Sequence, residues 1–102
     1  MAEPSFIAMS PHNYNSTVLA LAATVHASAT MPNFIITEYF LPLVAFGDKV
    51  CPNQLKPRNG YIDLPTAPGL GVDIDEAALA KYPGKAYAPR ALRHPGDEPG
   101  GI

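Results

Sequence analysis

Two short apolar runs, Ser5-Phe6-Ile7-Ala8-Met9 and Phe34-Ile35-Ile36-Thr37, decide how this chain folds. Uninterrupted apolar runs of this length are typical of strands that are buried on both faces of a parallel sheet. Between them, residues 17–30 carry apolar side chains at helical spacing, and Asn15 or Ser16 can cap a helix there. Strand, helix and strand in this order predict a right-handed βαβ unit of the α/β class, with its two strands parallel.

Polar side chains stand at the carboxyl ends of both predicted strands. His12 follows shortly after the first strand, and Glu38 ends the second. Neighbouring parallel strands lie about 4.8 Å apart with their carboxyl ends at one edge, so we expect both side chains to share one pocket. Ligand sites of α/β proteins lie at this edge, in open sheets and in barrels alike.

The composition excludes several classes of protein. The 102 residues are 47% apolar and 16% charged with a net charge of −2, so the chain lacks the basic face that nucleic-acid binding requires. No run reaches the ~20 apolar residues of a membrane span, and the N-terminus does not resemble a signal peptide. Cys51 is the single cysteine, so it forms neither an internal disulfide nor a zinc site by itself. We expect a cytoplasmic protein that binds neither nucleic acid nor membranes.

Charge and backbone-breaking residues are distributed unevenly along the chain. Residues 4–37 contain no Asp, Glu, Lys or Arg, whereas all 8 glycines and 9 of the 12 prolines lie beyond residue 41. An independent domain carries charge over its surface, so the uncharged first third predicts a piece of something larger. The second part is predicted to hold a loop over 47–59, a short strand over 60–65, a tight turn over 68–71 and a helix over 76–82. Asp73 or Asp75 can cap that helix, and we expect residues 85–102 to be mostly disordered.

Several sequence motifs together resemble one enzyme superfamily. They are Met9-Ser10-Pro11-His12-Asn13, Met31-Pro32-Asn33-Phe34 with Glu38, Asn59-Gly60-Tyr61-Ile62-Asp63-Leu64-Pro65, and Pro68-Gly69-Leu70-Gly71-Val72. In this order and spacing they resemble the C-terminal part of the enolase superfamily. The similarity is to the mandelate racemase and muconate lactonizing enzyme family, in its sugar-acid dehydratase-like branch.

The resemblance implies a fold. Members of the family carry a modified (β/α)7β barrel of the TIM type and an α+β capping domain. Residues 1–46 would then supply the last strands and helix of the barrel, so that the βαβ unit is its C-terminal piece. Residues 47–84 would supply the loop, short strand and helix of a segment that completes the capping domain.

The resemblance also implies a chemistry, the Mg²⁺-dependent abstraction of a proton α to a carboxylate. His12 matches a histidine that acts as general acid or base, and Glu38 matches an acidic residue that hydrogen-bonds the substrate or the intermediate. Histidine suits the first role because it takes up and releases protons near neutral pH. Asn13 and Tyr39 are candidate substrate-binding residues. The stretch that begins at Pro11 favours dehydration, but racemisation stays open.

Each candidate has a structural alternative. His12 could satisfy backbone groups of its loop, and Glu38 could be an ordinary exposed carboxylate at the end of a strand. Asn13 could serve the turn, and Tyr39 could serve packing.

The family's metal ligands and its lysine base would all precede Ser5, so none of them lies in this chain. We therefore expect that the chain alone binds no cofactor and turns nothing over, and that Mg²⁺ belongs to the complete family enzyme. Its partners would be the missing N-terminal part of the barrel or a second copy of itself, and the complete enzyme's substrate would be a sugar-acid carboxylate. The alternative is a small non-catalytic protein that associates through its apolar βαβ surface.

Overall fold

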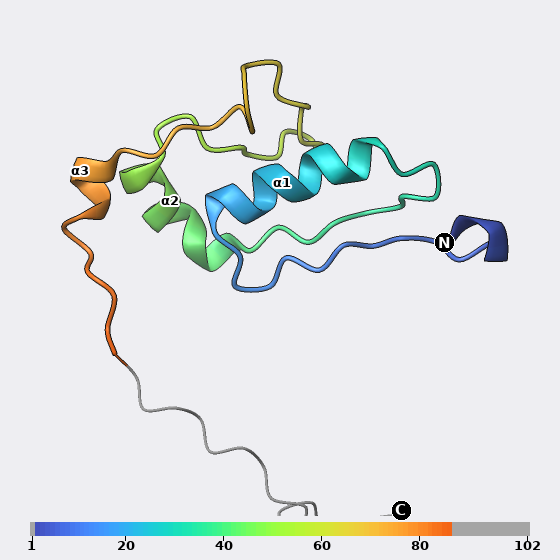
Figure 1. The fold of residues 1–102 in the computed structure, drawn as a ribbon, viewed down its shortest axis with the longest axis horizontal. Helices are drawn as coiled ribbons and strands as arrows, with labels where there is room; N and C mark the ends of the chain where they lie inside the picture. Colours follow the sequence, from blue (N-terminus) through green and yellow to red (C-terminus); the bar gives the residue numbers. More distant parts are fainter. Residues whose placement is uncertain (1, 87–102) are drawn as a thin grey trace, which may run out of the picture.

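A computed structural model describes residues 2–86 of the chain. Two extended segments run side by side below the longest helix, and the two other α-helices gather at one end of it (Figure 1). The elements in chain order are η1 (Glu3–Ser5), α1 (Val18–Ala29), η2 (Leu41–Leu43), α2 (Val44–Val50) and α3 (Glu76–Leu79).

Helix α1 confirms the helix that the apolar spacing predicts. It buries Leu21, Ala22 and Val25 against the rest of the chain. Its cap differs from the prediction, because the side chain of Thr17 accepts the backbone N–H of Ala20. Asn15 does not cap the helix because it has a φ of 55°, the left-handed conformation that turns the chain toward the helix.

The two predicted strands are present only as one parallel bridge, between Met9 and Phe34. The backbone N–H of Met9 donates to the carbonyl of Asn33 at 2.8 Å, and the N–H of Ile35 donates back to Met9 at 3.0 Å. The parallel direction is therefore as predicted, but residues 2–86 contain no strand.

Two features explain why the strands at 5–9 and 34–37 were predicted wrongly. Residues Glu3–Ser5 form a 3-10 turn, and Phe6 has a φ of 56°, which interrupts the extended run. A two-stranded pair is also marginal in water, because each backbone has hydrogen-bonding partners on one side only. The runs therefore stay extended and paired without forming a ladder.

The second half contains more helix than the sequence predicts. Helix α2 extends to Val50, into the stretch 47–59 that was predicted as a loop. The predicted strand over 60–65 is reduced to one antiparallel bridge between Arg58 and Tyr61, and α3 ends at Leu79.

The turn and the helix cap that the sequence predicts in this half agree better with the structure than the predicted loop and strand. The turn over 68–71 is confirmed, with a hydrogen bond of 3.2 Å from the N–H of Gly71 to the carbonyl of Pro68 and positive φ at both of its glycines. Of the two candidate caps of α3, Asp75 is the one used. The predicted disorder over 85–102 lies, from residue 87 onward, outside the described residues.

The described chain has a small core and much exposed apolar surface. The buried apolar side chains are Leu21, Ala22, Val25, Val50 and Cys51. Many large apolar side chains stay exposed, among them Phe6 at 99%, Tyr61 at 78% and Ile35 at 68%. No helix within residues 2–86 is long and apolar enough to cross a bilayer.

Candidate functional site

His12 and Glu38 meet at the carboxyl ends of the two extended segments. His12 Nδ1 lies 2.7 Å from Glu38 Oε2, and both side chains are open to solvent, at 76% and 50% exposure. The same Oε2 accepts the backbone N–H of Asn13 at 2.7 Å. The chain thus brings together the two side chains that the parallel arrangement predicts at one edge, although the catalytic roles of both stay predictions.

Two aromatic rings lie next to the imidazole of His12. The ring of Tyr14 stacks near that of His12 with centroids 6.2 Å apart, and Phe40 meets Tyr14 edge-on at 5.0 Å. Because Glu38 faces Nδ1, the carboxylate favours a proton on that nitrogen and leaves Nε2 to exchange a proton with a bound molecule. The pair can therefore act as an oriented general base or acid.

Asn13, whose backbone N–H contacts Glu38, is buried, with 2% of its surface exposed. Its Nδ2 donates to Thr37 Oγ1 at 2.8 Å, and its Oδ1 accepts the hydroxyl of Thr24 at 3.1 Å. The Thr37 hydroxyl donates in turn to the carbonyl of Pro11 at 3.0 Å. Asn13 therefore ties α1 to both extended segments; its predicted substrate contact stays a prediction.

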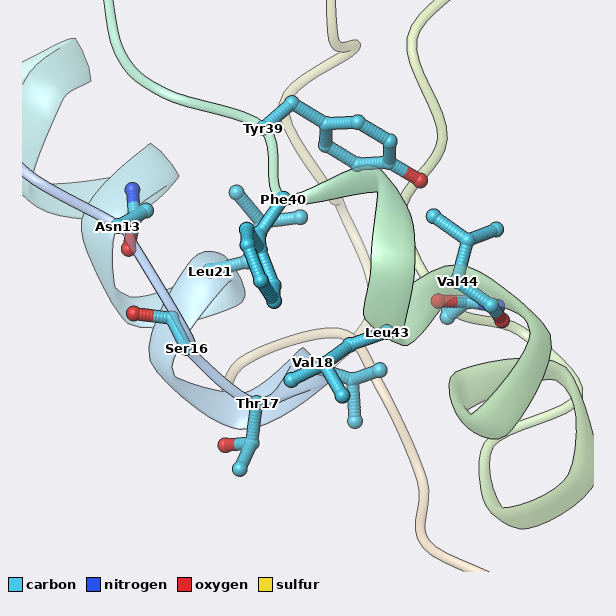
Figure 2. A pocket seen from close by; sticks show the side chains of 10 residues that line it. Asn13, Ser16, Thr17, Val18, Leu21, Tyr39, Phe40, Leu43 and Val44 are labelled. Carbon is cyan, nitrogen blue, oxygen red and sulfur yellow. The ribbon is translucent and has the colours of Figure 1, made fainter.

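Tyr39 follows Glu38 in the chain, and its hydroxyl bonds to a different segment. Its hydroxyl donates to the carbonyl of Leu55 at 3.3 Å, and Figure 2 shows that hydroxyl pointing away from Asn13. Burial raises the pKa of Tyr39, so the hydroxyl stays a hydrogen-bond donor at neutral pH. A substrate contact by Tyr39 also stays a prediction.

A small cavity lies between α1 and the segment that leads into α2 (Figure 2). Asn13, Leu21, Tyr39 and Phe40 are among the residues that line it. Its volume of about 30 Å³ matches the space of a single water molecule, so it does not hold a sugar acid. His12 and Glu38 are not part of its lining, and the surface that they present to a ligand is open.

The residues that the structure describes do not fit Mg²⁺. The part of the chain that the structure describes has no group of three His, Cys, Asp or Glu side chains placed to hold a metal ion. At the His12–Glu38 pair, one carboxylate stands beside an imidazole, whereas Mg²⁺ selects oxygen ligands in octahedral geometry. No metal-dependent step is therefore assigned to these residues.

Two residues of the site were missed by the sequence reasoning, Thr24 and Thr37. Thr24 is a hydroxyl residue inside a helix made mostly of alanine and leucine, and Thr37 directly precedes Glu38. The first position gives a usable signal, because a threonine in an apolar helix needs a partner for its hydroxyl. Nothing in the sequence indicates that the partner is Asn13.

Comparison with known proteins shows the family of this chain. Residues 1–78 match the family described as Enolase C-terminal domain-like. The chain belongs to this family. Its members' α/β class agrees with the order of extended segment, helix and extended segment seen here.

The similar proteins are named as D-galactonate dehydratase family members or as a D-mannonate dehydratase. The chain is 35% identical over 100 residues to a D-galactonate dehydratase family member of Streptomyces bingchenggensis, which covers 94% of this chain and 24% of the relative. It is 41% identical over 64 residues to a D-galactonate dehydratase family member of Oceanicola granulosus, over 63% of this chain and 16% of the relative. It is 39% identical over 72 residues to a D-mannonate dehydratase of a Caulobacter species, over 70% of this chain and 18% of the relative.

The chain thus spans a quarter or less of the length of these relatives. No solved structure matches it.

Proposed function

We propose that this chain is the C-terminal part of an enolase-superfamily enzyme that dehydrates a sugar acid. The contact of 2.7 Å between His12 Nδ1 and Glu38 Oε2 carries the proposal. It supports an oriented proton-transfer group at the edge where α/β proteins bind ligands. The names of the relatives supply the class of substrate, a sugar acid with its carboxylate.

In the proposed reaction a base of the complete enzyme would take the proton from the carbon next to the carboxylate, and the electron pair of the broken C–H bond would move toward the carboxylate. The intermediate then expels the neighbouring hydroxyl as water and forms an enol. His12 would protonate either the departing hydroxyl or the enol through Nε2, and Glu38 would hydrogen-bond the substrate or the intermediate. Asn13 and Tyr39 are the proposed substrate contacts.

The chain is proposed to depend on further polypeptide for activity. Residues 1–46 would complete a barrel and residues 47–84 a capping domain, in the cytoplasm. The many exposed apolar side chains support such a partner, because they have little to pack against within the described residues. The Mg²⁺ and the lysine base of the complete enzyme would be held by that partner, so we propose that the chain alone is inactive.

A chimera tests this function. This chain would replace the region of the Streptomyces bingchenggensis relative that aligns with it over 100 residues. We expect the chimera to dehydrate a sugar acid from a panel with Mg²⁺ present, the 102-residue chain alone to be inactive, and His12→Gln and Glu38→Gln to abolish turnover in the chimera. Turnover that survives both substitutions, or turnover by the chain alone, would contradict the proposal.

A second candidate function is association without catalysis. The exposed apolar side chains of Ile35, Ile36 and Tyr61 favour it, because a surface patch of this kind marks an interaction site. Sedimentation of the purified chain would then show a defined oligomer. The paired substitution of Ile35 and Ile36 by lysine would return it to the monomer, while the chimera would stay inactive.

A further inference from the structure

Thr24 links helix α1 to the loop that carries the His12–Glu38 pair. It lies in the middle of α1, within Val18–Ala29, and its hydroxyl donates to Asn13 Oδ1 at 3.1 Å. A threonine hydroxyl inside a helix usually bonds to the carbonyl four residues earlier. Here the hydroxyl instead reaches a side chain eleven positions away in the sequence.

The contacts continue from Asn13 to the pair without a gap. Asn13 Nδ2 donates to Thr37 Oγ1 at 2.8 Å, so Thr24 and Thr37 hold the side-chain amide from its two ends. With the side chain fixed, the backbone N–H of Asn13 is directed at Glu38 Oε2, which it reaches at 2.7 Å. His12 Nδ1 meets the same oxygen.

We propose that Thr24 is a positioning residue for the His12–Glu38 pair and acts through Asn13. The inference rests on the proposed function, since orientation of the pair matters only if the pair moves protons. Thr24 touches neither ring nor carboxylate. It holds Asn13, Asn13 holds Oε2, and Oε2 sets which imidazole nitrogen carries the proton.

The position of the proton on His12 is therefore the property that Thr24 controls. A fixed carboxylate at Nδ1 keeps the proton there and leaves Nε2 as the acceptor. When the carboxylate is free to rotate, the neutral ring distributes between both tautomers. Only the tautomer with the proton on Nδ1 leaves Nε2 free to take up the proton that His12 then delivers to the departing hydroxyl or the enol, so a mixture of tautomers is a less effective proton-transfer group.

Nitrogen-15 NMR of the imidazole rings in the full 102-residue chain tests the inference. Thr24→Val removes the hydroxyl and keeps the branched shape, and we expect His12 to lose its preference for the Nδ1–H tautomer. Thr24→Ser retains the hydroxyl and is expected to retain the preference. His26, whose Nε2 lies 3.2 Å from the carbonyl of Leu70, serves as a reference ring in the same spectrum.

Thr30→Val is the matched control, because the Thr30 hydroxyl bonds only locally, to the carbonyl of Ala27 at 2.7 Å. It is expected to leave His12 unchanged. Should Thr24→Val lose the helix signal in circular dichroism, Thr37→Val tests the same clamp from the other end of Asn13. An unchanged His12 tautomer in Thr24→Val, or an equal loss in Thr30→Val, would overturn the inference.

The inference and the proposed function can fail separately. A chimera that turns over while Thr24→Val leaves the tautomer unchanged would refute the positioning role alone. A tautomer that responds to Thr24→Val within an inactive chimera would support the positioning contact and refute the dehydratase.

Discussion

Replacing Asn13 by alanine should cost more stability than any other single polar substitution in the first forty residues. The side chain is 2% exposed and makes two hydrogen bonds, with Thr24 and with Thr37. Each such bond contributes about 1 kcal/mol net, so we expect Asn13→Ala to lower the free energy of unfolding by about 2 kcal/mol. With a urea slope of about 1.5 kcal/mol per M, the midpoint falls by about 1.3 M.

Urea unfolding followed by the helix signal in circular dichroism measures this loss. Asn33→Ala is the matched control, because Asn33 makes one exposed side-chain bond, to the carbonyl of Ile7 at 2.7 Å. Its expected cost is about 0.5 kcal/mol. A double-mutant cycle adds a second check, since Thr24→Val should cost little once Asn13 is already alanine. Equal costs at Asn13 and Asn33, or additive costs at Asn13 and Thr24, would refute the clamp described above.

Two further predictions concern α2 and the residue after it. Gly47→Ala should destabilise the chain by about 1 kcal/mol in urea unfolding, although alanine is the better helix former by about 1 kcal/mol. The Cβ added at residue 47 would overlap Gln54 Oε1 and displace the Gln54 side-chain amide. That amide donates to the carbonyl of Val44 at 2.9 Å and to Asp48 Oδ1 at 2.7 Å. In a Gln54→Ala background, where no amide is displaced, Gly47→Ala should instead stabilise the chain. Burial raises the pKa of the Cys51 thiol, so the folded state disfavours the thiolate. The buried neutral thiol therefore stabilises the fold at pH values below its ordinary pKa of about 8.5, and this stabilisation is lost as the pH rises through the raised pKa of the folded state. In Cys51→Ala, urea midpoints measured across this pH range should no longer show that loss at alkaline pH.

Local signals in the sequence predicted the helices of this chain better than its strands. Apolar spacing over residues 17–30 was sufficient for α1, because a helix closes its hydrogen bonds within itself. The runs at 5–9 and 34–37 have the composition of strands but make one bridge, since strands depend on neighbours that these residues do not supply to each other. The stretch over 47–59 was predicted as a loop because it holds Pro52, Pro57 and three basic residues, yet its first residues form the end of α2.

The candidate site, too, could be predicted from the sequence only in part. Parallel connection of the two runs was enough to predict that His12 and Glu38 lie at one edge, and the two atoms are 2.7 Å apart. The burial of Asn13 and the direction of the Tyr39 hydroxyl could not be predicted, because both depend on which carbonyls and hydroxyls the fold brings within reach. A sequence does not distinguish an asparagine in an exposed turn from one whose side chain is buried and hydrogen-bonded.

The amino-acid sequence alone determined the helix between the two apolar runs, the parallel direction of these runs and the placement of His12 and Glu38 at one edge, since these follow from local periodicity and chain connectivity. Only the tertiary structure decided that Thr24 reaches Asn13 and that Asn13 reaches Glu38. Those contacts join residues that are distant in the chain, and a hydrogen bond forms only where packing brings donor and acceptor within about 3 Å.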